Sequence, residues 1–190
     1  MNLKRLRAVL RYAVSVLARV GSFFDSIATA MDRQNNSNEA ITHFNRGAAY
    51  VAKGNYDKAI ADYTEAIQLK LDFTAAYYNR GIVHYRNEDY DKAITDFTEA
   101  IRFKPDFAEA YYNRGIVHYR NRDYDKTMAD YTEALRLNPD FAKTYYGRGL
   151  AYVLKEDYVR ARADWEKALQ IDPNLTEARN NLETLRGMGR

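Results

Sequence analysis

Apolar and polar positions between residues 40 and 175 recur with a period of 34 residues. The segment AYYNRGIVHYRNEDYD, from Ala76 to Asp91, returns almost unchanged as AYYNRGIVHYRNRDYD, from Ala110 to Asp125. Small residues follow the same period and mark four units, with glycines at 47, 81, 115 and 149 and alanines at 66, 100, 134 and 168. A fixed period of this length is typical of a solenoid, in which each unit buries its apolar face against the next.

Each unit contains two amphipathic stretches separated by a turn, which predicts a helix hairpin. The first helices are expected over residues 40–53, 74–87, 108–121 and 142–155, and the second helices over residues 56–69, 90–103, 124–137 and 158–171. Pro105, Pro139 and Pro173 stand just beyond three of the second helices, where a proline ends a helix. The repeats therefore predict an all-α stack of four hairpins.

Residues 1–33 follow a different pattern. Apolar residues step by three and four from Leu3 to Ile27, which predicts an amphipathic helix with one continuous apolar stripe. Gly21 and Ser22 predict a break before a second short helix that ends near Asp32. The polar residues QNNSN then predict a linker over residues 34–39.

Charge distinguishes this N-terminal segment from the repeats. The chain has a net charge of +3, and residues 1–33 alone carry six cations against two acids. Three roles stay open for the segment: packing on the repeats or on a second copy, contact with a membrane or a partner, and targeting to an organelle. The residues expected to make a membrane or partner contact are Leu3, Lys4, Arg5, Leu6, Arg7, Leu10, Arg11 and Leu17. The longest uncharged run here, Tyr12 to Ala18, is far shorter than the roughly 20 residues that span a bilayer.

The repeated motifs resemble the tetratricopeptide repeat (TPR). The 34-residue period, the Tyr-Tyr-Asn-Arg-Gly start, the Asp-Tyr-Asp-Lys-Ala turn and the closing Pro-Asp recur together over residues 40–186. The resemblance implies a right-handed superhelix with units at residues 40–73, 74–107, 108–141 and 142–175, and a capping helix and tail at 176–190. Three residues depart from the pattern: His43 in place of tyrosine, Thr127 in place of alanine and Leu71 in place of proline.

In repeats of this kind the first helices line a concave groove, so the resemblance identifies their inner faces as a binding surface. The residues expected there are Phe44, Asn45, Tyr78, Asn79, Ile82, Tyr85, Arg86, Tyr112, Asn113, Ile116, Tyr119, Arg120 and Tyr146. Aromatic walls, amides and two arginines suit an extended or helical peptide of a partner protein that presents acids between apolar anchors. The alternative is that these residues reflect the average sequence of the family and no chosen ligand.

The family's grip on the terminal carboxylate of chaperone tails is not expected here. Phe44 and Ala48 stand where such a clamp needs a lysine and an asparagine.

Other recurring polar residues have a structural explanation. Arg46, Arg80, Arg114 and Arg148 each precede an aspartate by 16 residues, which predicts one ion pair inside every hairpin. His84 and His118 occupy equivalent positions in adjacent units and are expected to be packed side chains, not metal ligands.

Little in the sequence favours catalysis. It shows no nucleophile with a base, no phosphate-binding loop and no metal-ligand cluster that the repeat does not explain, and it contains no cysteine. We therefore expect a non-catalytic interaction module, such as an adaptor, scaffold or assembly factor, with no cofactor and no metal. The alternatives are a membrane-peripheral scaffold, self-association through the N-terminal helix, and an RNA-binding repeat. The expected location is the cytoplasm or a membrane surface, and targeting to an organelle by the N-terminal segment stays open.

Overall fold

The computed structural model describes the backbone of residues 3–188 and the side chains of Arg19 and of residues 21–188. Within that range the chain forms nine helices and no strand. The helices are α1 (Leu3–Ala52), α2 (Tyr56–Leu69), α3 (Thr74–Arg86), α4 (Tyr90–Phe103), α5 (Ala108–Arg120), α6 (Tyr124–Leu137), α7 (Ala142–Leu154), α8 (Tyr158–Ile171) and α9 (Thr176–Gly187). The predicted all-α fold is confirmed.

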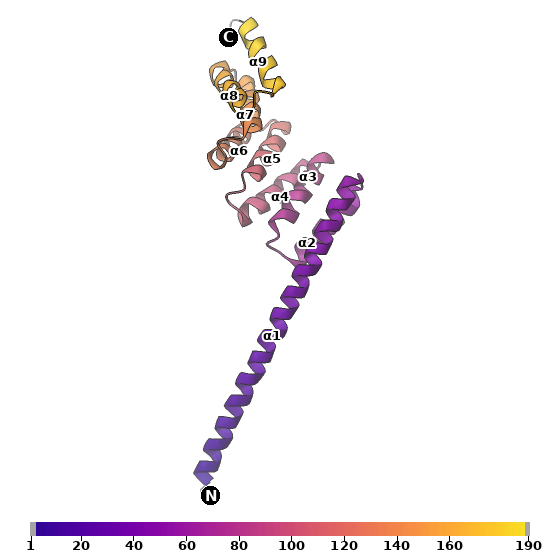
Figure 1. The fold of residues 1–190 in the computed structure, drawn as a ribbon, viewed down its shortest axis with the longest axis vertical. Helices are drawn as coiled ribbons and strands as arrows, with labels where there is room; N and C mark the ends of the chain where they lie inside the picture. The colour runs from indigo at the N-terminus through magenta and orange to yellow at the C-terminus, as the bar shows by residue number, and fades with distance from the viewer. Residues whose placement is uncertain (1–2, 189–190) are drawn as a thin grey trace.

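The helices stack as consecutive hairpins (Figure 1). The pairs α1 and α2, α3 and α4, α5 and α6, and α7 and α8 pack together, and each second helix also contacts the first helix of the next unit. The first helices α1, α3, α5 and α7 touch their counterparts in neighbouring units. α9 packs on α8 and ends the stack, as predicted for a capping helix.

The predicted helix ends agree closely with the structure. All four second helices begin and end at the predicted residues, and α3, α5 and α7 end one residue earlier than predicted. The carboxylates of Asp123 and Asp157 accept hydrogen bonds from the backbone N–H groups of Lys126 and Arg160, which caps the first turns of α6 and α8.

Aromatic side chains of the second helices form the centre of each hairpin. Tyr63, Phe97, Tyr131 and Trp165 occupy equivalent positions and are buried. Each lies against the glycine of its own first helix, and at Gly115 a Cβ atom would stand only 2.7 Å from Cε1 of Tyr131. The recurring glycines therefore permit a close approach between the first helix and a large ring.

α1 is one unbroken helix of 50 residues, so the predicted break at Gly21 and the predicted non-helical linker at residues 34–39 are wrong. The hydroxyl of Ser22 donates to the carbonyl of Arg19 inside the helix and does not cap a new one. At the expected linker, the Gln34 side chain donates to the Asn38 side chain over 3.2 Å, one turn further on. A single glycine costs a helix only about 1 kcal/mol, and no proline stands in this region to stop it.

The N-terminal part of α1 projects away from the stack, and its free end lies far from α9 (Figure 1). Residues 21–36 are exposed, so this part of the helix does not pack on the repeats, and that part of the prediction is wrong. Packing on a second copy, contact with a membrane or a partner, and targeting stay predictions. Leu3, Lys4, Arg5, Leu6, Arg7, Leu10, Arg11 and Leu17 lie outside the residues whose side chains are described. Among the described residues, no helix combines the length and the apolar character of a membrane span.

Candidate functional site

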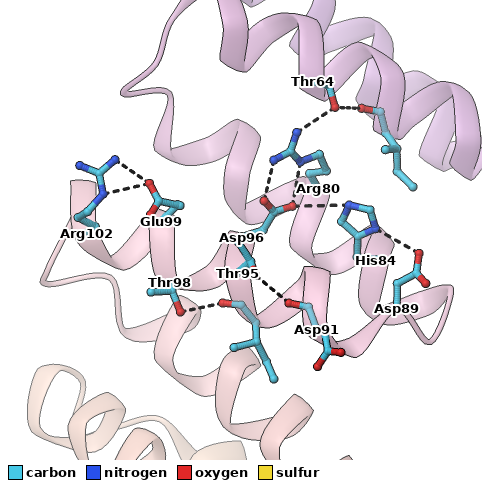
Figure 2. Close-up of polar contacts among 12 residues, drawn as sticks. Thr64, Arg80, His84, Asp89, Asp91, Thr95, Asp96, Thr98, Glu99 and Arg102 are labelled. Atoms are coloured by element: carbon cyan, nitrogen blue, oxygen red, sulfur yellow. Dashed lines mark hydrogen bonds and ion pairs between the residues drawn. The ribbon is translucent and has the colours of Figure 1, made fainter.

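An arginine–aspartate ion pair holds each hairpin together. In the second unit, Nε of Arg80 donates to one carboxylate oxygen of Asp96 over 2.9 Å and Nη2 donates to the other over 2.7 Å (Figure 2). The same two-bond pairing joins Arg46 to Asp62, Arg114 to Asp130 and Arg148 to Asp164. The predicted ion pairs are confirmed in all four units. These arginines stabilise the hairpins through their aspartates.

The same arginines also tie neighbouring units together. Nη1 of Arg80 donates to the Thr64 hydroxyl of the preceding second helix over 2.9 Å (Figure 2), and Arg114 reaches Thr98 over 3.0 Å. The sequence signal for this contact was the threonine that recurs 34 residues apart, which the sequence reasoning did not use.

His84 and His118 are buried beside these ion pairs, as expected for packed histidines. Nε2 of His84 lies 3.8 Å from Asp96, and Nε2 of His118 lies 3.8 Å from Asp130. Burial is the main cause that lowers the pKa of both imidazoles, and the neighbouring aspartates oppose it. In the part of the chain that the structure describes, no group of three or more histidine and acidic side chains gathers closely enough to hold a metal ion.

The aromatic residues predicted for the inner face are partly buried. Tyr78 packs between Phe97 and Phe107, with ring centroids at 5.9 and 4.7 Å, and Tyr112 packs between Tyr131 and Phe141 in the same way. Phe44 contacts Tyr63 and Phe73, and Tyr146 is half-buried. The rings therefore serve first to pack the hairpins and present only part of their surface.

The amide positions differ from one unit to the next. Asn113 donates to the Tyr78 hydroxyl over 2.8 Å and to the Glu109 carbonyl over 2.9 Å. For Asn79, the residue at the position equivalent to Tyr78 is Phe44, which has no hydroxyl. The Asn79 side chain makes no hydrogen bond with any described residue. Asn45 is exposed. Within the described part of the chain, the side-chain amides of Asn79 and Asn45 thus have both their donor and their acceptor groups free, whereas the donor group of Asn113 is occupied.

The two predicted arginines remain exposed on the C-terminal turns of α3 and α5. Cζ of Arg86 lies 6.0 Å from the centre of the Tyr56 ring. A hydrogen bond to the Tyr85 hydroxyl raises the pKa of Arg120. Each guanidinium therefore leans toward the preceding unit and carries a full positive charge without an acidic partner among the described ion pairs.

The apolar members of the predicted surface lie beside these cations. Ile82 and Tyr85 pack against the cluster of Ala93, Phe97 and Val117 and are half-buried. Ile116 is likewise half-buried, and Tyr119 meets the Tyr124 ring at 5.8 Å.

A pocket of about 370 Å³ opens where this surface reaches the last unit. Its apolar lining comes from α5, α7, α8 and α9, and its polar members are Asn181 and Thr184. The apolar lining includes Tyr119, Leu150, Val153, Leu154, Trp165 and Leu185. Only Tyr119 was among the predicted site residues. Periodicity alone could place Leu150 on the inner face but could not show that α9 forms the facing wall.

Models of known families match most of the repeats. A model described as a TPR repeat matches residues 47–88 and 87–121, and the tetratricopeptide repeat model matches residues 108–141 and 142–175. The chain belongs to the tetratricopeptide repeat family. No curated protein matches the chain at the level of sequence. The repeat fold is typically non-catalytic and serves protein interaction, so the family places this TPR protein among interaction modules.

Solved structures agree with this assignment. A crystal structure of MamA is 26% identical, with a TM-score of 0.69 over 74% of this TPR chain and 82% of MamA. MamA from Desulfovibrio magneticus RS-1 is 22% identical, with a TM-score of 0.74 over 80% and 85% of the two chains, which shows the fold alone. The first TPR domain of Spaghetti (RPAP3), bound to the HSP90 peptide SRMEEVD, is 25% identical, with a TM-score of 0.59 over 60% of this chain and 91% of that domain.

Proposed function

We propose that this TPR protein is an adaptor, scaffold or assembly factor that binds an acidic peptide segment of a partner protein on the inner faces of α3, α5 and α7. The observation that carries the proposal is the set of groups left free there. Asn79 lacks an internal partner, and Arg86 and Arg120 are exposed cations one repeat apart.

The charges favour an acidic segment. The other arginines of the first helices, such as Arg80 and Arg114, are paired with aspartates, which leaves Arg86 and Arg120 as the arginines of α3 and α5 that can pair with a ligand. Guanidinium groups bind carboxylates through two parallel hydrogen bonds, and an amide such as Asn79 can pair with peptide backbone. The peptide held by the Spaghetti TPR domain, SRMEEVD, also combines acidic with apolar residues.

The experiment selects ligands for the full chain from a displayed library of random dodecapeptides and measures their affinity by fluorescence anisotropy. We expect the selected peptides to be rich in aspartate and glutamate. The double variant Arg86→Gln, Arg120→Gln should weaken their binding at least about 10-fold, because each lost bond is charge-assisted.

The matched control removes the same charge elsewhere. Arg102 and Arg136 lie exposed on second helices, each paired with a glutamate of its own helix. Replacing both by glutamine should leave the affinity within about 2-fold. Equal losses in the two double variants, or selected peptides without acids, would reject the proposal.

Nucleic acid is a weaker candidate ligand. Residues 34–190 carry a net charge of −1, and the four arginines that recur on the first helices are held by aspartates. Binding to RNA or DNA draws on a track of free cations, which these repeats do not supply.

A second candidate role belongs to α1. Phe23, Phe24, Ile27 and Met31 are exposed on a helix that projects from the repeats, and the sequence before them carries five cations and no acid. We propose that this helix attaches the protein to an anionic membrane surface, since basic amphipathic helices bury their apolar face at that boundary.

Sedimentation with vesicles of phosphatidylserine and phosphatidylcholine tests the attachment. The full chain should sediment, and the variant Phe23→Ser, Phe24→Ser, Ile27→Ser should stay in solution, because these side chains contribute nothing to the repeats. A chain that stays in solution with anionic vesicles, yet forms dimers in light scattering, would instead show that the stripe pairs with a second copy.

A further inference from the structure

Two of the differences between the fourth unit and the second and third units lie at the C-terminal end of the inner face of α7. Where those units have Tyr85 and Tyr119, the fourth has Val153. Where they have Arg86 and Arg120, it has Leu154. At these two positions the inner face therefore changes from an aromatic and a basic side chain to two aliphatic ones.

The residues at these two positions, Val153 and Leu154, line the pocket of about 370 Å³ beside α9. In the third unit the Tyr119 ring fills the space next to Tyr124, with ring centroids at 5.8 Å. Val153 is much smaller than tyrosine, and the corresponding space at the fourth unit stays open. Its volume lies at the lower end of the roughly 300–1,000 Å³ typical of ligand pockets.

The capping helix forms one wall of this space without filling it. Leu182 and Leu185 of α9 are buried on the fourth hairpin, as a capping helix requires. Leu154 and Met188 line the pocket and yet are 48% and 62% exposed. Large apolar side chains that are exposed around an open pocket are a common sign of a binding site.

We infer that this pocket accepts one large apolar side chain of a peptide, such as leucine, methionine or phenylalanine, while acidic residues of the same peptide lie on Arg86 and Arg120. The inference rests on the proposed function and adds the placement of the bound peptide along the repeats. The acidic residues of the peptide lie toward the N-terminal repeats, and its apolar side chain lies toward α9. Charge agrees with this placement, since the cation of the second and third units is lost at Leu154.

Trp165 allows the pocket to be tested directly. It is the single tryptophan of the chain, it lines the pocket, and its Nε1 donates to the Tyr146 carbonyl over 3.1 Å. The probes are peptides of four glutamates followed, after zero to four alanines, by one test residue. The test residue is 4-iodophenylalanine, phenylalanine or alanine, and the iodine quenches tryptophan emission only at close contact.

For at least one spacing, the iodophenylalanine peptide should quench Trp165 emission, and its phenylalanine counterpart should not. The alanine peptide should bind about 10- to 100-fold more weakly, as expected for the loss of one buried apolar side chain. The variant Val153→Tyr restores the residue of the second and third units and should fill the pocket, so the preference for phenylalanine over alanine should disappear. The control Val159→Tyr adds the same ring at a valine that is 81% exposed and outside the pocket, and it should keep the preference.

The outcomes separate this inference from the proposed function. Binding that depends on Arg86 and Arg120 but gives equal affinity for phenylalanine and alanine would overturn the pocket alone. Tight binding of the iodophenylalanine peptide without quenching would do the same, as would an unchanged preference in folded Val153→Tyr. If no glutamate peptide binds at all, the proposed function fails together with the pocket.

Discussion

Tyr131 packs between two glycines, so the effect of substituting either glycine on the free energy of unfolding can be worked out from the structure. The ring is buried, with one edge against Gly115 of its own hairpin and the other against Gly147 of the next. A Cβ at residue 115 would lie 2.7 Å from Cε1 and 2.8 Å from Cδ1, and a Cβ at residue 147 would lie 3.1 Å from Cε2, Cζ and the hydroxyl oxygen. The substitution Gly115→Ala therefore forces the ring toward Gly147.

Two opposing effects determine how much Gly115→Ala changes the free energy of unfolding. Forcing an extra carbon into a packed core costs about 1–3 kcal/mol. Alanine gains about 1 kcal/mol over glycine inside a helix. Gly115→Ala should thus lower the free energy of unfolding by about 1 kcal/mol, whereas Gly147→Ala, with its looser contact, should be close to neutral. In the double variant the ring has no direction in which to move, and the loss should exceed the sum of the single losses by at least about 0.5 kcal/mol.

Circular dichroism melts and urea titrations measure these differences, and about 1 kcal/mol corresponds to a shift of about 2–4 °C in Tm for a chain of this length. Gly21→Ala is the control, because nothing lies within 4 Å of that site. It should raise helicity without moving the transition of the repeats. A Gly115→Ala protein as stable as its parent, together with additive effects in the double variant, would show that the Tyr131 ring is not tightly held between the two glycines.

Three further predictions follow from individual side chains. Burial lowers the pKa of His84 and His118, so as pH falls through about 6.5 the unfolded chain binds more protons than the folded chain. The free energy of unfolding should therefore fall between pH 7 and pH 5. Replacing both histidines by tyrosine should reduce this pH dependence, measured by urea titrations. Phe44→Tyr supplies the hydroxyl that Asn79 lacks and should raise stability by about 1 kcal/mol, while it weakens binding of the selected peptides by occupying that amide. Asp130→Asn breaks the two-bond pairing with its arginine and should cost about 3 kcal/mol, measured by the same titrations.

The chain itself supplies controls for these variants. Tyr50 and Tyr152 already stand at the positions equivalent to the two histidines, so tyrosine fits that site. An undiminished pH slope in the tyrosine variant would show that other groups cause it. Glu99→Gln, in an exposed pair with Arg102, should change stability by less than about 1 kcal/mol. If Asp130→Asn lowered the free energy of unfolding as little as Glu99→Gln, the buried ion pair would have no structural role.

Repetition made the helix boundaries predictable. Each turn and each first-helix glycine recurs in every unit, and α4 and α6 begin at Tyr90 and Tyr124, which occupy equivalent positions. The ion pairs were predictable for the same reason, because a 16-residue separation between arginine and aspartate recurs in every unit.

Features without an internal repeat were less predictable. Gly21 and the polar run near Asn38 suggest a break, yet local propensity is weak against the continuity of a helix whose C-terminal end packs on α2. The single contact of Asn113 with Tyr78 depends on a hydroxyl that Phe44 lacks, so equivalent amides have different surroundings. The pocket at the fourth unit required the position of α9, which no periodicity gives.

We propose that the inner faces of the first helices hold a segment of another protein. Amide chemical shifts of the full chain, recorded by NMR with and without a saturating selected peptide, test it most directly. We expect the changes to concentrate on α3, α5 and α7 and on the part of α9 near Leu185. Changes confined to the second helices or to the projecting part of α1 would contradict it.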